Sequence, residues 1–247
     1  MTHISSPVNG TIAPLTNVAL FADLIGKIVN PPPHLPRLGL FYGYSGYGKT
    51  WSARYAANKH RAFYLECGES WTKRRFLRAL LDVLGVEARG TADDMMDKAV
   101  SALRGYRRPL IIDEADHIVK RGYIETIREL HDQGFAPIAL LGEELLPQNI
   151  ERVSERTHNR ILLHVAAQPG TAEDAAILAQ LYHPAIAVAP DLLDAVAEAS
   201  AGRLRRIVVN LYNIATEAEV QGWCTVDRAL WGDRPFFTGA SPRRRHG

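Results

Sequence analysis

The run from Gly43 to Thr50, Gly-Tyr-Ser-Gly-Tyr-Gly-Lys-Thr, has the G-x-x-x-x-G-K-[ST] pattern of a phosphate-binding loop. A glycine-rich backbone lets successive N–H groups point at one phosphate chain. Lys49 would add a positive charge beside the β- and γ-phosphates, and the Thr50 hydroxyl would be a ligand of Mg²⁺. The sequence therefore predicts binding of a nucleoside triphosphate together with Mg²⁺. The residues expected to contact this nucleotide are Gly43, Tyr44, Ser45, Gly46, Tyr47, Gly48, Lys49, Thr50 and Trp51.

Two adjacent carboxylates, Asp113 and Glu114, follow the apolar run Leu110-Ile-Ile, about 60 residues after the phosphate loop. A buried strand ending here would bring Asp113 to the carboxyl edge of a sheet, where it can hold Mg²⁺ directly or through water. Glu114 would then lie on the γ-phosphate side and orient or activate a water for in-line attack. A surface pair of acids is the alternative, and the phosphate loop upstream favours the catalytic interpretation.

The pattern of apolar residues predicts the strands and helices that would hold these residues in place. Leu38–Tyr42 is predicted as a buried strand directly before the loop, with a helix from Thr50 onward. Further strands are expected over Ala62–Glu66, Pro109–Asp113, Pro137–Leu141 and Arg160–Val165, and helices over Asn17–Val29, Lys73–Leu84, Ala92–Leu103 and Ile118–Gln133. Alternating strands and helices predict an α/β fold class, with a parallel sheet and right-handed crossovers.

The pattern changes after Gln168-Pro-Gly170, where helices follow one another and no convincing strand occurs. The expected helices are Thr171–Tyr182, which begins with a capping signal, Pro190–Ala199 and Arg203–Glu219. We therefore divide the chain into an N-terminal helix with a proline-rich connector (1–36), an α/β nucleotide-binding core (37–168), a small helical lid (169–222) and a basic, loosely held tail (223–247).

Of the 247 residues, 47% are apolar and 23% are charged, which is typical of a globular protein. No apolar run approaches the roughly twenty residues that span a bilayer, and the N-terminus has no signal-peptide pattern. Cys67 and Cys224 have no metal-type spacing, so we expect free thiols in a reducing compartment, the cytoplasm. The net charge of +2 is too small to indicate a polyanionic partner, and only short basic clusters point to one.

The phosphate loop and the Asp113-Glu114 pair, followed by helical segments, resemble the motifs of the AAA+ ATPases over roughly residues 15 to 220. The resemblance implies a P-loop AAA+ core with a five-stranded parallel sheet flanked by helices, and a small all-helical lid. It also implies an enzyme that hydrolyses ATP with Mg²⁺. A polar sensor-one residue is usual after the fourth strand, where this chain reads Gly142-Glu143-Glu144. Glu143 is the closest match by position, and a simple loop acid is the alternative.

Two arginines have counterparts in the same resemblance. Thr157-His-Asn-Arg160-Ile161 resembles the segment that leads into the family's fifth strand, which makes Arg160 the expected catalytic arginine finger. A finger acts on the nucleotide of a neighbouring subunit. Arg156 is the second choice, and an ordinary surface ion pair is the alternative for Arg160. Gly202-Arg-Leu-Arg205-Arg206 resembles the sensor-two signature, so Arg205 would contact the nucleotide of its own subunit and Arg206 would be structural.

Within the AAA+ proteins, the compact core and Gly142-Glu-Glu-Leu-Leu146 most resemble the transposition regulators, which include the target-DNA activator B protein of Mu-type phages, TnsC and TniB. That resemblance implies ATP-dependent homo-oligomers, as helical filaments or rings, on duplex DNA in a bacterial host cell, and a transposase as partner. The helix-turn-helix module of the B protein has no counterpart here. A replication-initiator or helicase-loader type, and a secretion-associated remodelling ATPase that does not use DNA, therefore remain alternatives.

Two basic clusters are the first candidates for contacts with the DNA backbone. Thr72, Lys73 and Arg74 open a predicted helix, where side chains and helix-start N–H groups can contact phosphates. Lys120 and Arg121 follow the acidic motif. The tail Arg243–Arg245 is a third candidate, and Trp71 is expected either to pack on the core or to touch DNA. Binding through phosphates would be independent of DNA sequence.

Overall fold

The computed structural model describes residues 15–106 and 108–240. These residues fall into two compact units, which we describe separately. The first, the core unit, comprises residues 16–169 and 203–205. The described part of the second, the C-terminal unit, comprises residues 15, 170–202 and 206–240.

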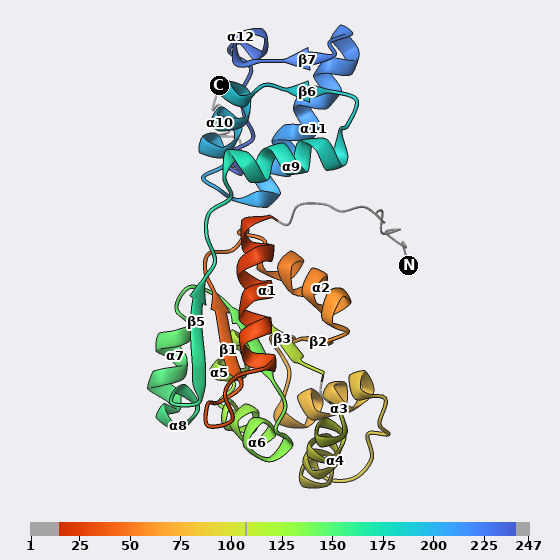
Figure 1. Cartoon of the computed structure of the whole chain (residues 1–247), viewed down its shortest axis with the longest axis vertical. Helices are drawn as coiled ribbons and strands as arrows, with labels where there is room; N and C mark the ends of the chain where they lie inside the picture. The colour runs from red at the N-terminus through yellow and green to blue at the C-terminus, as the bar shows by residue number, and fades with distance from the viewer. Residues whose placement is uncertain (1–14, 107, 241–247) are drawn as a thin grey trace, which may run out of the picture. The chain divides into compact units, whose positions relative to one another are not determined.

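The core unit is built on a parallel sheet with the strand order β2-β3-β4-β1-β5 (Figure 1). Its strands are β1 (Leu38–Tyr42), β2 (Phe63–Glu66), β3 (Leu110–Asp113), β4 (Ile138–Gly142) and β5 (Ile161–Ala166). Its helices are α1 (Thr16–Val29), α2 (Lys49–His60), α3 (Lys73–Leu84), α4 (Ala92–Gly105), α5 (Asp116–Lys120), α6 (Glu125–Gly134), α7 (Leu146–Val153) and α8 (Glu155–His158). The predicted five-stranded parallel sheet is confirmed, and the end of every strand lies within one residue of its predicted position.

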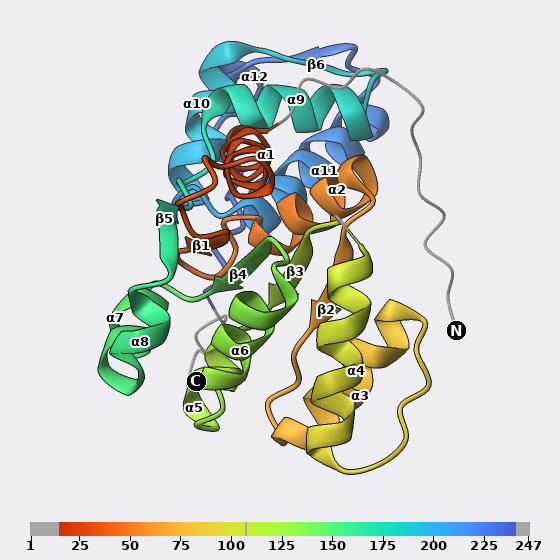
Figure 2. The same cartoon turned by 60° about the horizontal axis from the view of Figure 1, so that its bottom comes forward.

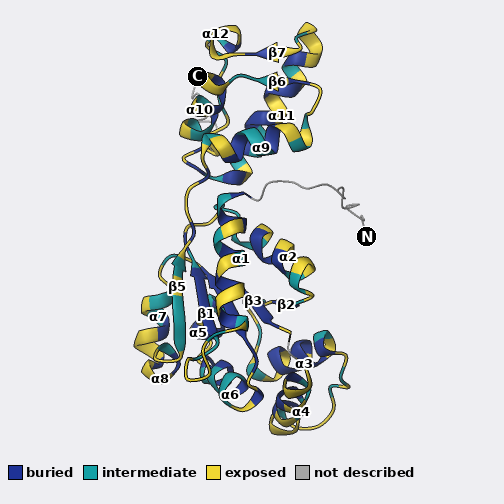
Figure 3. Ribbon diagram, viewed as in Figure 1, coloured by how far each residue is buried: buried dark blue, intermediate teal, exposed yellow. Residues whose placement is uncertain are grey.

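Helices cover both faces of this sheet (Figure 2). Phe41 and Leu141 point to the face covered by α1 and α2. Leu40 and Leu140, one position away, pack with α3, α4 and α6 on the other face. The strands β1, β3 and β4 are therefore buried on both sides, which explains their nearly continuous apolar sequences (Figure 3).

One predicted helix of the core unit is two helices in the structure. The range Ile118–Gln133 contains the end of α5 and most of α6. Gly122, between them, has φ +74, a left-handed conformation that interrupts a right-handed helix. Tyr123 and Ile124 are buried in this turn, so the apolar spacing continues although the helix does not. The short helices α7 and α8 occupy a stretch to which the sequence analysis assigned no structure.

The C-terminal unit contains the three predicted helices and two additional short strands. Its elements are α9 (Ala172–Tyr182), β6 (Ala187–Val188), α10 (Pro190–Ala199), α11 (Leu204–Gln221), of which the first two residues group with the core unit, β7 (Thr225–Val226) and α12 (Arg228–Trp231). Strands of two residues are too short to show the alternation that reveals a strand. The first part of the predicted loosely held tail contains β7 and α12. Val226 and Trp231 in these two elements are buried, so this part is packed against the rest of the C-terminal unit. Its Arg243–Arg245 cluster lies outside the described residues.

Within the described ranges, no helix combines the length and the apolarity needed to cross a bilayer. Cys67 is buried and Cys224 is exposed, and both are free thiols, as the sequence predicts.

Candidate nucleotide-binding site

The phosphate loop connects β1 to α2. Gly48 is the N-cap of α2 and has φ 86, a left-handed conformation that glycine adopts without strain. No side chain of the described residues caps this helix, so the N–H groups of its first turn remain available to an anion. Tyr44, Ser45 and Trp51 are exposed around the loop. The loop therefore offers backbone donors, as a phosphate cradle requires.

Asn17, at the start of α1, contacts this loop through its side chain, and the sequence did not predict this contact. Its buried side-chain Nδ2 donates hydrogen bonds of 2.7 Å to the carbonyl oxygens of Tyr47 and Gln168. Its Oδ1 accepts a hydrogen bond of 2.8 Å from the Gln168 backbone N–H. Asn17 thus ties the phosphate loop to the segment after β5. The residue stands at the start of a helix, where a polar side chain is ordinary, so the sequence gives no signal of this contact.

Lys49 lies over the phosphate loop. Its Nζ donates hydrogen bonds to the carbonyl oxygens of Gly43 at 2.6 Å and Tyr44 at 3.1 Å. Thr50 follows it in the first turn of α2 and is half-buried. The ammonium is therefore positioned at the mouth of the loop, where a phosphate chain would meet it.

Acidic side chains converge on this ammonium. Burial lowers the pKa of Lys49, and the negative charges of Glu114, Asp113, Asp116 and Glu143 act in the opposite direction. Asp113 ends β3, and Glu114 and Asp116 follow it. Glu143 directly follows β4. The fold thus brings one cation and four acids to the carboxyl edge of the sheet, the edge at which the nucleotide site is predicted.

Asp113 ends β3 and is 2% exposed. Its Oδ1 accepts a hydrogen bond from the Glu114 N–H at 2.9 Å, and its Oδ2 accepts one from the Tyr64 hydroxyl at 3.0 Å. Each carboxylate oxygen keeps a further lone pair. Mg²⁺ prefers one or two carboxylates completed by water and substrate phosphates. Asp113 and the Thr50 hydroxyl are hard oxygen donors of this kind, so they fit a magnesium ion held jointly with a nucleotide.

Glu114 has an unusual backbone conformation. Its φ of +56 lies in the left-handed region, which costs a residue other than glycine of the order of 1 kcal/mol or more. Strain of this kind is concentrated at functional sites. Burial and the neighbouring Asp113 charge raise the pKa of Glu114. A carboxylate with a raised pKa accepts a proton more readily, which suits the predicted role as the base beside an attacking water.

Tyr64 on β2 is a second residue that the sequence analysis missed. Strand β2 pairs in parallel with β3, in the register Glu66↔Asp113, so Tyr64 lies within reach of the Asp113 carboxylate. The Arg54 guanidinium lies 5.9 Å from the centre of the Tyr64 ring and also pairs with Glu66 at 3.3 Å. Burial and the Asp113 charge raise the pKa of Tyr64 well above its ordinary value, so the phenol remains a hydrogen-bond donor. Tyr64 therefore orients the expected Mg²⁺ ligand.

Replacing Tyr64 with phenylalanine is expected to raise the Mg²⁺ concentration for half-maximal ATP hydrolysis about tenfold, because groups that orient a metal ligand typically contribute 10- to 100-fold. A titration of turnover against Mg²⁺ measures this. Tyr55→Phe on α2, where the ring is 41% exposed, is the matched control and should leave the titration unchanged. An equal effect of both variants would exclude a specific role for the Tyr64 hydroxyl.

The position after the fourth strand differs from a usual sensor-one site. The Asp116 carboxylate occupies the space beside Gly142 and accepts a hydrogen bond of 2.7 Å from the Glu143 N–H. Burial raises the pKa of Asp116. Glu143 is exposed and acts on Lys49 through its charge. Asp116 is thus a polar group at this place that the sequence analysis did not select.

Gly142→Ala is expected to lower the free energy of unfolding by about 1 to 3 kcal/mol, as overpacking does in cores. A Cβ on Gly142 would lie 2.2 Å from Asp116 Oδ2 and 2.5 Å from Leu146 Cδ2. Chemical denaturation followed by circular dichroism measures the loss. Gly105→Ala is the control, because a Cβ there meets nothing within 4 Å, and it should be neutral or stabilising. Equal stability of the two variants would contradict this packing.

The predicted finger Arg160 lies directly before β5 and is exposed. Its Nε pairs with Asp132 Oδ1 at 3.1 Å, so it forms the surface ion pair that we gave as its alternative role. It stands at the amino end of the sheet, whereas the phosphate loop follows the carboxyl end of β1, one five-residue strand or about 16 Å away. Within one subunit Arg160 is therefore remote from the nucleotide site. Arg156, on α8, is also exposed.

The two sensor-two candidates have different surroundings. Arg205 is exposed at the second position of α11. Arg206, the next residue, lies against Gly239 within the C-terminal unit, where a Cβ would be 2.8 Å from Arg206 Nε. This packing agrees with a structural function for Arg206, and the assignment of Arg205 to the nucleotide stays a prediction.

The loop that leads into the first basic cluster contacts the second basic cluster in the core unit. The Thr72 hydroxyl caps α3 by accepting a hydrogen bond from Arg75 N, and Lys73 and Arg74 form the first turn of that helix. Glu69, in the preceding loop, connects this segment to the end of α5, because its carboxylate pairs with Lys120 at 3.1 Å. The guanidinium of Arg121 donates to the Glu69 carbonyl at 2.9 Å. Trp71 packs partly on the core and carries the Arg75 guanidinium 5.2 Å from its ring.

Comparison with known proteins agrees with this architecture. Residues 34–150 match the AAA domain family. No curated protein gave a match to the sequence.

Solved structures with a similar fold include three archaeal proteins. ORC2 of Aeropyrum pernix, in its ADPNP–ADP complexes, is 16% identical with a TM-score of 0.63 over 87% of this chain and 65% of its own. Cdc6p of Pyrobaculum aerophilum is 14% identical with a TM-score of 0.59 over 89% of this chain and 66% of its own. ORC1 of A. pernix, in complex with DNA, is 20% identical with a TM-score of 0.62 over 89% of this chain and 64% of its own.

This chain thus spans slightly less than two thirds of the length of these archaeal proteins, and at such identities the likeness concerns the fold. The sheet, the flanking helices and the phosphate loop have the arrangement predicted for a P-loop AAA+ fold. The stretch that matches the AAA domain family, residues 34–150, contains the phosphate loop, strands β1 to β4 and the Asp113-Glu114 pair.

Proposed function

We propose that this protein is an ATPase that binds ATP with Mg²⁺ at the phosphate loop and hydrolyses it. The observation that carries the proposal is the convergence of Lys49 with the carboxylates of Asp113 and Glu114 at one edge of the sheet. Lys49 and the free N–H groups at the start of α2 would hold the phosphates. Mg²⁺, when bound, would neutralise charge on the β- and γ-phosphates. Glu114 would orient the attacking water and accept its proton.

The second part of the proposal is that the ATP-bound protein assembles on duplex DNA without sequence preference. It is supported by two basic clusters, Lys73-Arg74 and Lys120-Arg121, whose segments are joined by the contacts of Glu69 with Lys120 and Arg121. One subunit offers few phosphate contacts, so an array of subunits is needed to release many counterions at once. The structure of ORC1 with DNA adds a precedent on a similar fold.

Replacing Lys73 and Arg74 together with alanine should weaken DNA binding equally for all sequences and reduce the slope of log K against log salt by roughly two. Filter binding or fluorescence anisotropy at several salt concentrations, with ATP present, measures the slope. The control is the Lys59→Ala/Arg89→Ala double variant, which removes the same charge from exposed positions elsewhere in the core unit. A slope that is unchanged in the first variant would move the DNA surface away from α3.

For the cellular role, we propose a target-DNA activator that recruits a transposase, on the sequence resemblance to the transposition regulators. The archaeal structures favour a replication-initiator type as the second candidate. Both roles require assembly on duplex DNA, which electron micrographs of the protein with ATP, with and without duplex DNA, can test. Assemblies that form only with DNA would support both roles, and closed rings that form equally without DNA would contradict both. A transposase gene next to the gene for this protein would favour the first role. A strand-transfer assay with that transposase would then separate the two roles, because only an activator would redirect insertion to DNA that it covers.

A further inference from the structure

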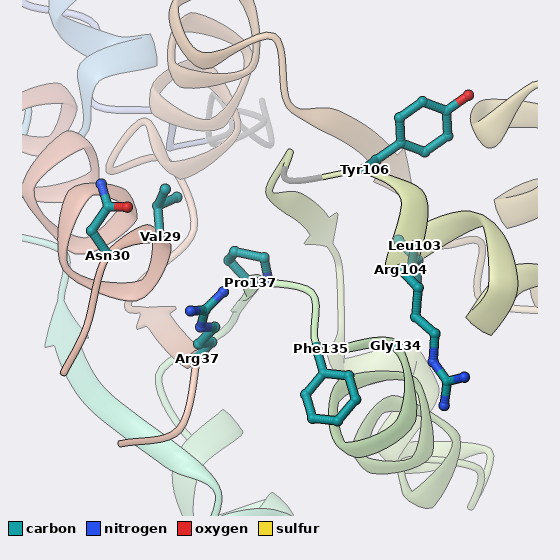
Figure 4. A pocket seen from close by; sticks show the side chains of 9 residues that line it. All are labelled: Val29, Asn30, Arg37, Leu103, Arg104, Tyr106, Gly134, Phe135 and Pro137. Carbon is teal, nitrogen blue, oxygen red and sulfur yellow. The ribbon is translucent and has the colours of Figure 1, made fainter. Parts of the chain in front are cut away.

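A pocket of about 320 Å³ opens in the core unit at the amino ends of β1 and β4 (Figure 4). Arg37 and Pro137, which directly precede these two strands, form part of its wall, together with residues at the ends of α1, α4 and α6. The phosphate loop lies at the opposite, carboxyl end of β1. The pocket is therefore separate from the nucleotide site, and no role for it follows from ATP hydrolysis.

Phe135 is the most unusual residue of this pocket. Its side chain is 69% exposed, and its φ of +52 places it in the left-handed region at the end of α6. A glycine or asparagine would end the helix here with less strain. Exposure of a large apolar ring and a strained backbone both oppose folding, so neither accounts for a phenylalanine. An exposed aromatic group beside a pocket is instead typical of a contact with another molecule.

The remaining lining is aromatic and positively charged. Tyr106 is 43% exposed, and its ring is fixed by an edge contact with Phe63 at 5.3 Å between centroids. Arg104 donates from Nε to the Gln133 carbonyl at 2.6 Å, and its guanidinium lies 6.0 Å from the Phe135 ring centre. Its terminal nitrogens make no hydrogen bond or ion pair with another described residue, so they can bind an anion. Within the described residues, the Arg37 guanidinium forms no ion pair, and no carboxylate lines the pocket. The site thus combines apolar walls with two unneutralised cations.

We propose that this pocket binds an acidic peptide segment of a partner protein, with one aromatic side chain inserted between Phe135 and the apolar walls. Leu103 and Pro137 supply those walls, and the guanidinium groups of Arg37 and Arg104 bind flanking carboxylates. Aromatic residues and arginine are the groups that dominate protein interfaces. A nucleic acid would need a row of cations along its phosphates, whereas here two arginines flank a compact pocket. A small ligand would leave most of the Phe135 ring uncovered.

The test is a selection from a random heptapeptide display library on the full-length protein, with Phe135→Asn protein used for counter-selection. We expect peptides that carry one aromatic residue and at least two acidic residues. A synthetic, labelled peptide of the selected sequence should bind about tenfold or more weakly to Phe135→Asn and to Arg104→Ala, as is usual for interface anchors. Tyr182→Asn, which changes a ring of 40% exposure in the C-terminal unit, is the matched control and should bind normally.

Thermal unfolding and ATP turnover separate this contact from a structural role. Asparagine tolerates the left-handed conformation, so Phe135→Asn should unfold at the same or a higher temperature and hydrolyse ATP as before. The proposal is overturned if the wild-type and Phe135→Asn proteins select the same peptides, or if basic peptides are enriched. It is equally overturned if a single-stranded oligonucleotide binds this pocket in place of the peptide. A loss of peptide binding in the variants that is no larger than their loss of folded protein would also overturn it.

Discussion

Glu114→Gln protein is expected to bind ATP with nearly unchanged affinity and to hydrolyse it about a thousandfold more slowly, within the range usual for loss of a general base. The amide keeps the size of the side chain but cannot accept the proton of the attacking water. Lys49 and the phosphate loop, which would hold the nucleotide, are untouched. Binding of a fluorescent ATP analogue and release of phosphate measure the two quantities separately.

The control for this result is Lys49→Ala, which removes the cation over the loop and should abolish ATP binding itself. A second variant, Glu114→Gly, removes the carboxylate and also relieves the strained φ of +56. It should therefore lose turnover while gaining thermal stability, as glycine does at left-handed positions. Turnover at the parental rate in Glu114→Gln would remove Glu114 from the mechanism.

Arg160→Ala is expected to lower ATP turnover about a thousandfold without weakening ATP binding, as loss of an arginine finger supplied by a neighbouring subunit does. Every subunit keeps its own phosphate loop, whereas hydrolysis needs the neighbour's guanidinium. The fold should tolerate the change, because ion pairs as exposed as Arg160–Asp132 contribute about 0 to 1 kcal/mol. Steady-state turnover of the assembled protein and nucleotide binding measure the two effects.

Asp132→Asn distinguishes the finger from the ion pair seen in the structure. It removes the negative charge that pairs with Arg160 but leaves the guanidinium in place, so turnover should persist if Arg160 acts on a neighbour. A loss of turnover equal to that of Arg160→Ala would show that turnover depends on the ion pair and not on a finger. Mixing Arg160→Ala with Lys49→Ala protein should restore some activity, since a mixed interface can join an intact loop with an intact arginine. Confirmed co-assembly without recovery would bring Arg156 forward.

The sequence by itself determined the parts of this protein that depend on neighbouring residues. The spacing of glycines with Lys49 and Thr50 defines the phosphate loop wherever it lies, and apolar runs of four to six residues located every strand of the core sheet. The central strands β1, β3 and β4 are buried on both faces of the parallel sheet, so the ends of their apolar runs show directly in the sequence. The apolar pattern could not reveal the break at Gly122, because buried residues there keep the helical spacing.

Only the tertiary structure decided which distant side chains meet. Tyr64 reaches Asp113 because β2 lies beside β3, although the two residues are 49 positions apart. In the same way Glu69 pairs with Lys120, 51 positions away, which joins the loop before α3 to the end of α5. The amino ends of parallel strands lie at one edge of the sheet. Arg160, before β5, therefore pairs with Asp132, before β4, and Phe135 lies beside a pocket at the same edge. Strand order and register set these contacts, and neither is encoded in any short stretch of residues.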